Sequence, residues 1–69
     1  MTNNKAKINQ AMGLLITAVY SGGEKAVWSI AKGQGETAEL ARQAIELYTN
    51  PYHNMSLIEA VNIVTQSHV

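Results

Sequence analysis

Apolar residues along the chain recur three or four positions apart, and breaks rich in glycine and polar residues separate the apolar segments. This spacing is the period of an α-helix lying on a core, and no segment alternates as a strand does. Glycine ends helices, and serine, threonine and asparagine cap their first turns. We expect four helices: from Thr2, Asn3 or Asn4 to the Ser21-Gly22-Gly23 segment, from there to about Lys32, from about Glu36 to Tyr48, and from Ser56 to about Gln66.

Two S-x-x-E patterns mark the expected starts of the second and fourth helices. Ser21 precedes Glu24, and Ser56 precedes Glu59, by the three positions of a capping box, in which each side chain bonds a backbone N–H of the other residue. The third helix is expected to end before Pro51, because the residue preceding a proline is pushed out of the helical conformation.

The third and fourth predicted helices are amphipathic, with glutamates opposite their apolar sides. The expected fold is therefore all-α, a small bundle of three to four short helices in a single helical domain, residues 1–69, completed by self-association. The expected core residues are Ile8, Leu15, Val19, Ile30, Leu40, Ala44, Ile45, Val61 and Val64.

The first predicted helix differs from the others because its apolar arc covers more than half of its circumference. No charged residue occurs between Lys7 and Glu24. An exposed helix face usually carries lysine or glutamate, so we expect this helix to be covered on two sides. Gly13 costs about 1 kcal/mol relative to alanine, and it lets another helix approach closely, either one of the same chain or one of a partner. The candidate self-association residues are Ala6, Gly13, Leu15 and Thr17.

Composition and charge also favour a homodimer. A chain of 69 residues makes a thin core, and this one has no cysteine to cross-link it. Charged residues make up 14% of the sequence, below the usual share of about 25%. Residues 1–35 carry four lysines and one glutamate, and residues 36–69 carry one arginine and four glutamates, so the halves have charges of +3 and −3. Halves of opposite charge attract each other across an antiparallel dimer, although two separate solvated faces explain this charge distribution equally well.

The N-terminal sequence has some features of a secretion signal, with Lys5 and Lys7 ahead of an apolar run. However, Asn9 and Gln10 separate the charges from the run, and the Ala18-Val19-Tyr20 segment is a poor cleavage site. The run is also shorter than the roughly 20 residues of a membrane span. We therefore expect a cytoplasmic protein.

Residues with catalytic or metal-binding chemistry are few and scattered. His53 and His68 are the two histidines, and the chain has no aspartate. A zinc site needs three or four ligands, and a nucleophilic serine needs a base and an orienting acid. We therefore expect no enzyme activity, no metal and no cofactor. The glycine turns at residues 22–23 and 33–35 precede helix starts, where anions bind, but a glutamate follows each turn. Whether they bind a small anionic ligand stays open.

Aromatic residues suggest where another protein would bind. Tyrosine and tryptophan dominate contact energies at interfaces, although in so short a chain the position of Trp28 slightly favours a residue that closes the edge of a small core. We expect a small helical protein-interaction module, an adaptor or inhibitor of a larger protein that acts as a homo-oligomer. The candidate partner-binding residues are Tyr20, Trp28, Tyr48, Tyr52 and His53.

The alternative function is a small helical DNA-binding regulator of helix-turn-helix type. The second and third predicted helices, joined by the Gly33–Gly35 turn, have the required order. Lysines 5, 7, 25 and 32 would then contact phosphates. The charges oppose nucleic acid as a partner, because the recognition helix would present three glutamates and one arginine to the DNA.

Overall fold

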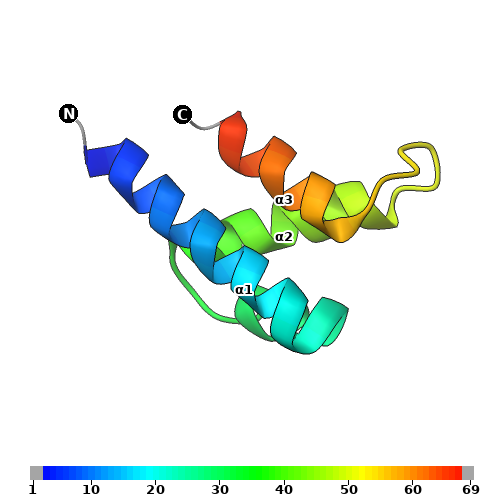
Figure 1. The fold of residues 1–69 in the computed structure, drawn as a ribbon, viewed down its shortest axis with the longest axis horizontal. Helices are drawn as coiled ribbons and strands as arrows, with labels where there is room; N and C mark the ends of the chain where they lie inside the picture. The colour runs from blue at the N-terminus through cyan, green and yellow to red at the C-terminus, as the bar shows by residue number, and fades with distance from the viewer. Residues whose placement is uncertain (1–2, 68–69) are drawn as a thin grey trace.

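The computed structural model describes residues 3–67 and confirms a small all-α bundle. It contains α1 (Asn3–Ala31), α2 (Glu36–Thr49) and α3 (Leu57–Gln66), and no strand within the described range. Each helix contacts the other two, with α2 crossing behind α1 and α3 in Figure 1. The expected capping role of Thr2 lies outside the described residues.

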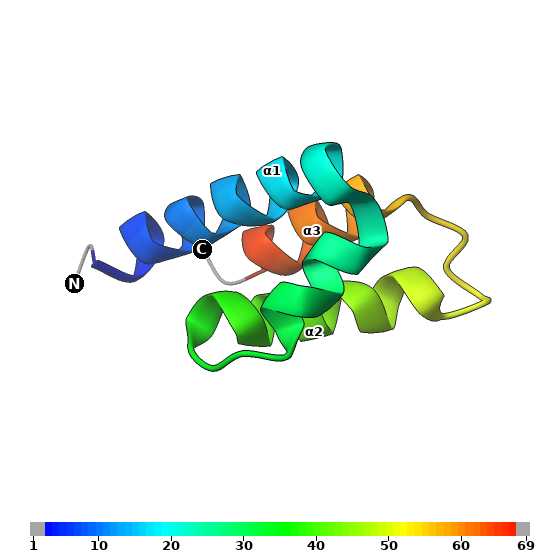
Figure 2. The ribbon, with the colours of Figure 1, turned by 90° about the horizontal axis from the view of Figure 1, so that it is seen from below.

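A sharp kink at Gly23 divides α1 into two segments. The backbone of Gly23 has φ 68° and ψ −149°, which is not helical, whereas helical structure continues on both sides of it. We call residues 3–22 the first segment and residues 24–31 the second segment. Figure 2 shows the second segment turning away from the first and descending to α2. The first two predicted helices are thus joined directly at a kink, without a loop. Within residues 3–67, no helix is both long enough and apolar enough to cross a membrane.

The capping box predicted for Ser21 and Glu24 is wrong. The hydroxyl of Ser21 donates a hydrogen bond to the carbonyl of Ala18 at 3.5 Å. The carboxylate of Glu24 accepts one from the indole nitrogen of Trp28 at 3.3 Å. Both side chains therefore bond within their own segment, because the chain changes direction at Gly23 alone and leaves no separate helix start for Ser21 to cap.

Helix α2 begins and ends through its backbone conformation. It starts after Gly35, which has a positive φ of 105° and caps the helix without a side-chain hydrogen bond. Its last residue is Thr49, one position beyond the predicted end. Asn50 then adopts an extended conformation with φ −71° and ψ 119°, as expected for the residue before Pro51.

The capping box predicted at the start of α3 is confirmed. The hydroxyl of Ser56 accepts a hydrogen bond from the backbone N–H of Glu59 at 3.2 Å. The backbone N–H of Ser56 donates to the carboxylate of Glu59, also at 3.2 Å. Both partners lie within one turn, so the motif forms without help from the rest of the fold.

Seven of the nine predicted core residues are buried, and Val19 and Ile30 lie half-buried at the edge of the core. Most of the buried residues outside that list of nine are alanines, whose small side chains bring the helix backbones close together. The others complete the apolar sides of the helices, except for Thr65, whose hydroxyl donates to the carbonyl of Val61 at 2.8 Å. The additional buried residues are Ala11, Ala18, Val27, Ala31, Ala38, Ala41, Leu57, Ala60 and Thr65.

Replacing Ser56 by alanine is expected to lower the free energy of unfolding by about 1 kcal/mol, because the first turn of α3 loses its cap. Replacing Ser21 by alanine is the matched control and should change stability by less than about half as much, since Ser21 does not cap a helix. Urea unfolding followed by circular dichroism measures both. Equal losses for the two variants would contradict the assignment.

Candidate functional site

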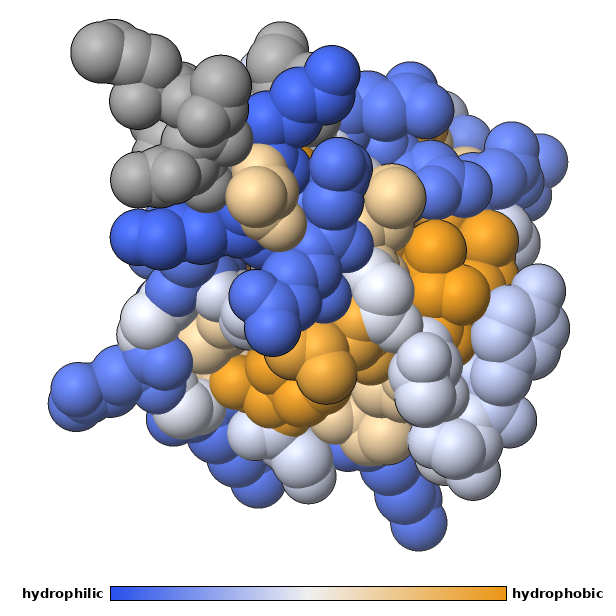
Figure 3. Space-filling model, turned by 60° about the vertical axis from the view of Figure 1, so that its left-hand side comes forward, coloured by the Kyte–Doolittle hydropathy of each residue, from blue (hydrophilic) through white to orange (hydrophobic). Residues whose placement is uncertain are grey.

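One side of the first segment of α1 is exposed from Ala6 to Tyr20 and carries no charge. We call it the uncharged face. Leu14 is 53% exposed and Tyr20 is 80% exposed, and the residues between them in space are small or polar. Figure 3 shows that, on the side of the molecule it views, apolar surface is divided into patches by hydrophilic and paler residues. The uncharged face consists of Ala6, Asn9, Gln10, Gly13, Leu14, Thr17 and Tyr20.

Gly13 lies at the centre of the uncharged face and in open space. A side chain added at Gly13 would meet no atom within 4 Å. Of the two explanations left open for this glycine, the close approach of a helix from the same chain is therefore wrong, because α2 and α3 pack on the opposite side of α1. The lower helix propensity of glycine is not offset by any contact inside the described chain.

The structure separates the four candidate self-association residues into two groups. Ala6, Gly13 and Thr17 are exposed on the uncharged face. Leu15 is fully buried in the core, where it packs with the apolar residues of α2 and α3. Leu15 therefore belongs to the core and not to the surface of the uncharged face. Tyr20, which is exposed on that face, is added to Ala6, Gly13 and Thr17 as a candidate contact residue.

The five candidate partner-binding residues lie in different parts of the molecule. Tyr20 is on the uncharged face, whereas Tyr48 is half-buried against the core. Tyr52 is 92% exposed in the segment between α2 and α3. His53 follows it, and its ring nitrogen Nδ1 lies 3.2 Å from the carbonyl oxygen of Leu47.

Trp28 lies at a groove between the second segment of α1 and α2. A surface cavity of about 290 Å³ is lined there by Trp28, Arg42, Ile45, Glu46 and Thr49. Trp28 is 44% exposed, and its indole nitrogen bonds Glu24. We did not predict the α2 side of this groove, although its residues follow the three- and four-residue spacing of a single helical stripe.

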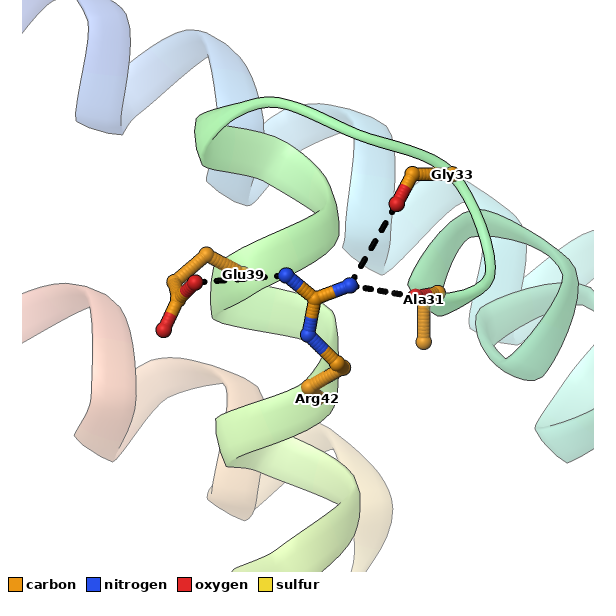
Figure 4. Close-up of polar contacts among 4 residues, drawn as sticks. All are labelled: Ala31, Gly33, Glu39 and Arg42. Atoms are coloured by element: carbon orange, nitrogen blue, oxygen red, sulfur yellow. Dashed lines mark hydrogen bonds and ion pairs between the residues drawn. The ribbon is translucent and has the colours of Figure 1, made fainter.

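Arg42 joins the end of α1 to α2. One guanidinium nitrogen donates to the carbonyls of Ala31 at 2.8 Å and Gly33 at 3.3 Å, and the other donates to the carboxylate of Glu39 at 3.2 Å (Figure 4). These carbonyls belong to the end of α1 and the turn that follows it. Arg42 therefore provides the cation that helix C-termini favour.

The glycine turn at residues 33–35 lies beside a surface cavity of about 470 Å³. Glu36 and Glu39 line this cavity together with Arg42. Two carboxylates disfavour an anion, and the guanidinium of Arg42 already bonds two carbonyls and Glu39. The same acidic residues stand where a DNA-binding helix would meet phosphates, so the geometry does not favour the DNA-binding alternative.

Neither of the two cavities is lined by a histidine or a serine. In the described part of the chain, no group of three or more histidine, cysteine, aspartate or glutamate residues is placed to hold a metal ion. His68, the second histidine, lies outside the described residues.

Comparison with known proteins adds no family. No family model matches the chain, and no curated protein or solved structure is significantly similar to it.

Replacing Arg42 by methionine is expected to lower the free energy of unfolding by about 1 to 2 kcal/mol, because the carbonyls of Ala31 and Gly33 lose a charged donor. Arg42→Lys should lose less than Arg42→Met because lysine keeps a charged donor, but it should still lose some stability because an ammonium donates to fewer partners than a guanidinium. Lys32→Met, at an exposed lysine near the same turn, is the control and should change stability little. Chemical unfolding compares the three, and an Arg42→Met variant as stable as the control would refute the role.

Proposed function

We propose that this protein is a small helical protein-interaction module, an adaptor or inhibitor of a larger protein, which acts as a homo-oligomer. The observation that supports the proposal is the uncharged face of α1, which is exposed from Ala6 to Tyr20. In a chain whose other two helices carry glutamates on their outer sides, an exposed helix face without charge is the exception.

The contact surface of the module is the centre of the uncharged face. Ala6, Gly13 and Thr17 have small side chains that let a partner helix approach, and Leu14 and Tyr20 supply exposed apolar area beside them. About 100 Å² of apolar surface removed from water contributes roughly 2.5 kcal/mol before the cost of ordering. This gain is large for a thin core, and a two-fold dimer is the commonest way to obtain it.

The cellular location proposed with this function is the cytoplasm. A small chain without a single cysteine suits a compartment in which disulfides do not form.

Replacing Gly13 by lysine tests the contact surface. The side chain has open space in the monomer, and lysine favours a helix more than glycine does, so the monomer should be at least as stable. A charge at the centre of the contact should dissociate the dimer. Sedimentation velocity across micromolar concentrations should show a dimer for the unmodified chain and a monomer for Gly13→Lys.

A matched control and a competing outcome complete the test. Gln66→Lys adds the same charge at an exposed position of α3, and this variant should remain dimeric. A monomer for the unmodified chain over the same concentrations would defeat the homo-oligomer. Retention on immobilised DNA that falls steeply with salt would instead favour the DNA-binding regulator.

A further inference from the structure

Glycine adopts the backbone conformation at the kink of α1 readily, whereas every other residue type strongly disfavours it. Gly23 has φ 68° and ψ −149°, a combination that is essentially restricted to glycine. A side chain added at Gly23 would meet no atom within 4 Å, so the restriction lies in the backbone angles and not in the space around the residue.

Gly22 maintains the same kink for a different reason. A Cβ atom added at Gly22 would lie 2.7 Å from the Cβ atom of Ala26, which is closer than two carbon atoms can approach. In a regular helix, residues four positions apart have Cβ atoms about 5 to 6 Å apart. Two neighbouring glycines therefore permit the kinked α1 by independent means, one through backbone angles and one through a close contact.

A straight α1 cannot remain on its own α2 and α3. A continuous helix of 29 residues is about 44 Å long, whereas the longest dimension of the whole molecule is 36 Å. The first segment supplies Ile8, Ala11, Leu15 and Ala18 to the core, and the second segment supplies Val27 and Ala31. Straightening α1 while the second segment stays in place would lift the first segment off and expose its apolar residues to water.

We propose that Gly22 and Gly23 keep residues 3–22 on their own chain, and that a second copy of this chain takes up the lifted first segment when the kink is disfavoured, so that two copies exchange residues 3–22 about this hinge. Each first segment then packs on the α2 and α3 of its partner, in the contacts that it makes within one chain in the kinked form. Exchange of an identical element is a low-cost route to a dimer, because nearly all contacts are recovered. The inference does not rest on the proposed function, since the uncharged face stays exposed in both forms.

The test uses full-length chains that carry Gly13→Lys, which blocks association through the uncharged face. In this background, Gly23→Ala disfavours the kink through its backbone angles, and Gly22→Ala disfavours it through the contact with Ala26. An exchanged dimer contains two straightened α1 helices and therefore avoids the disfavoured kink twice. Either change should thus lower the dimer dissociation constant by about a hundredfold or more. Sedimentation velocity should then show dimers for both variants. Gly33→Ala, at a glycine whose added Cβ atom would make an ordinary 3.4 Å contact, is the control and should stay monomeric.

The exchanged contacts distinguish this dimer from any other. In a mixture of ¹³C-labelled and unlabelled Gly23→Ala chains, isotope-filtered NMR should detect contacts between Leu15 of one copy and core methyl groups of α2 and α3 of the other. Monomers for both hinge variants, folded or unfolded, would overturn the proposal. Dimers that lack these intermolecular contacts would overturn it as well.

Discussion

The architecture depends on the positive φ of Gly23. This one residue turns a helix of 29 residues into two segments at an angle, and both segments then place apolar side chains in the same core. Without the turn, Leu15 and Val27 could not meet in one core. The rest of the structure adds to this constraint: α3 packs against the other two helices, and Arg42 ties the end of the second segment to α2.

The core combines branched aliphatic residues with many alanines, which gives this short chain close helix packing without cysteines or large aromatic side chains. Ala41, Ala44 and Ala60 are fully buried, and each allows two backbones to come near one another. The aromatic residues are left at the edge or on the surface. Apolar area that a larger core would absorb therefore remains exposed, and this is the physical basis of the interaction module proposed above.

The sequence predicted features whose cause is local and missed features whose cause is tertiary. The Ser56 capping box and the end of α2 before Pro51 depend on residues within one turn, so their patterns sufficed. Ser21 shows the same pattern as Ser56 but does not cap, because glycine can either end a helix or bend it and the pattern does not distinguish the two. The bonds from Arg42 to Ala31 and Gly33, and the open space around Gly13, depend on how the helices meet in three dimensions.

The position of Trp28 has an optical consequence. Trp28 is the single tryptophan of the chain, lies five residues beyond the kink, and donates a hydrogen bond to Glu24 at the start of the second segment. Its indole ring is partly shielded beside Ile45 of α2 and partly in solvent. The fluorescence emission wavelength of Trp28 in the native protein therefore depends on how closely the second segment packs against α2, and it reports this packing without an attached dye.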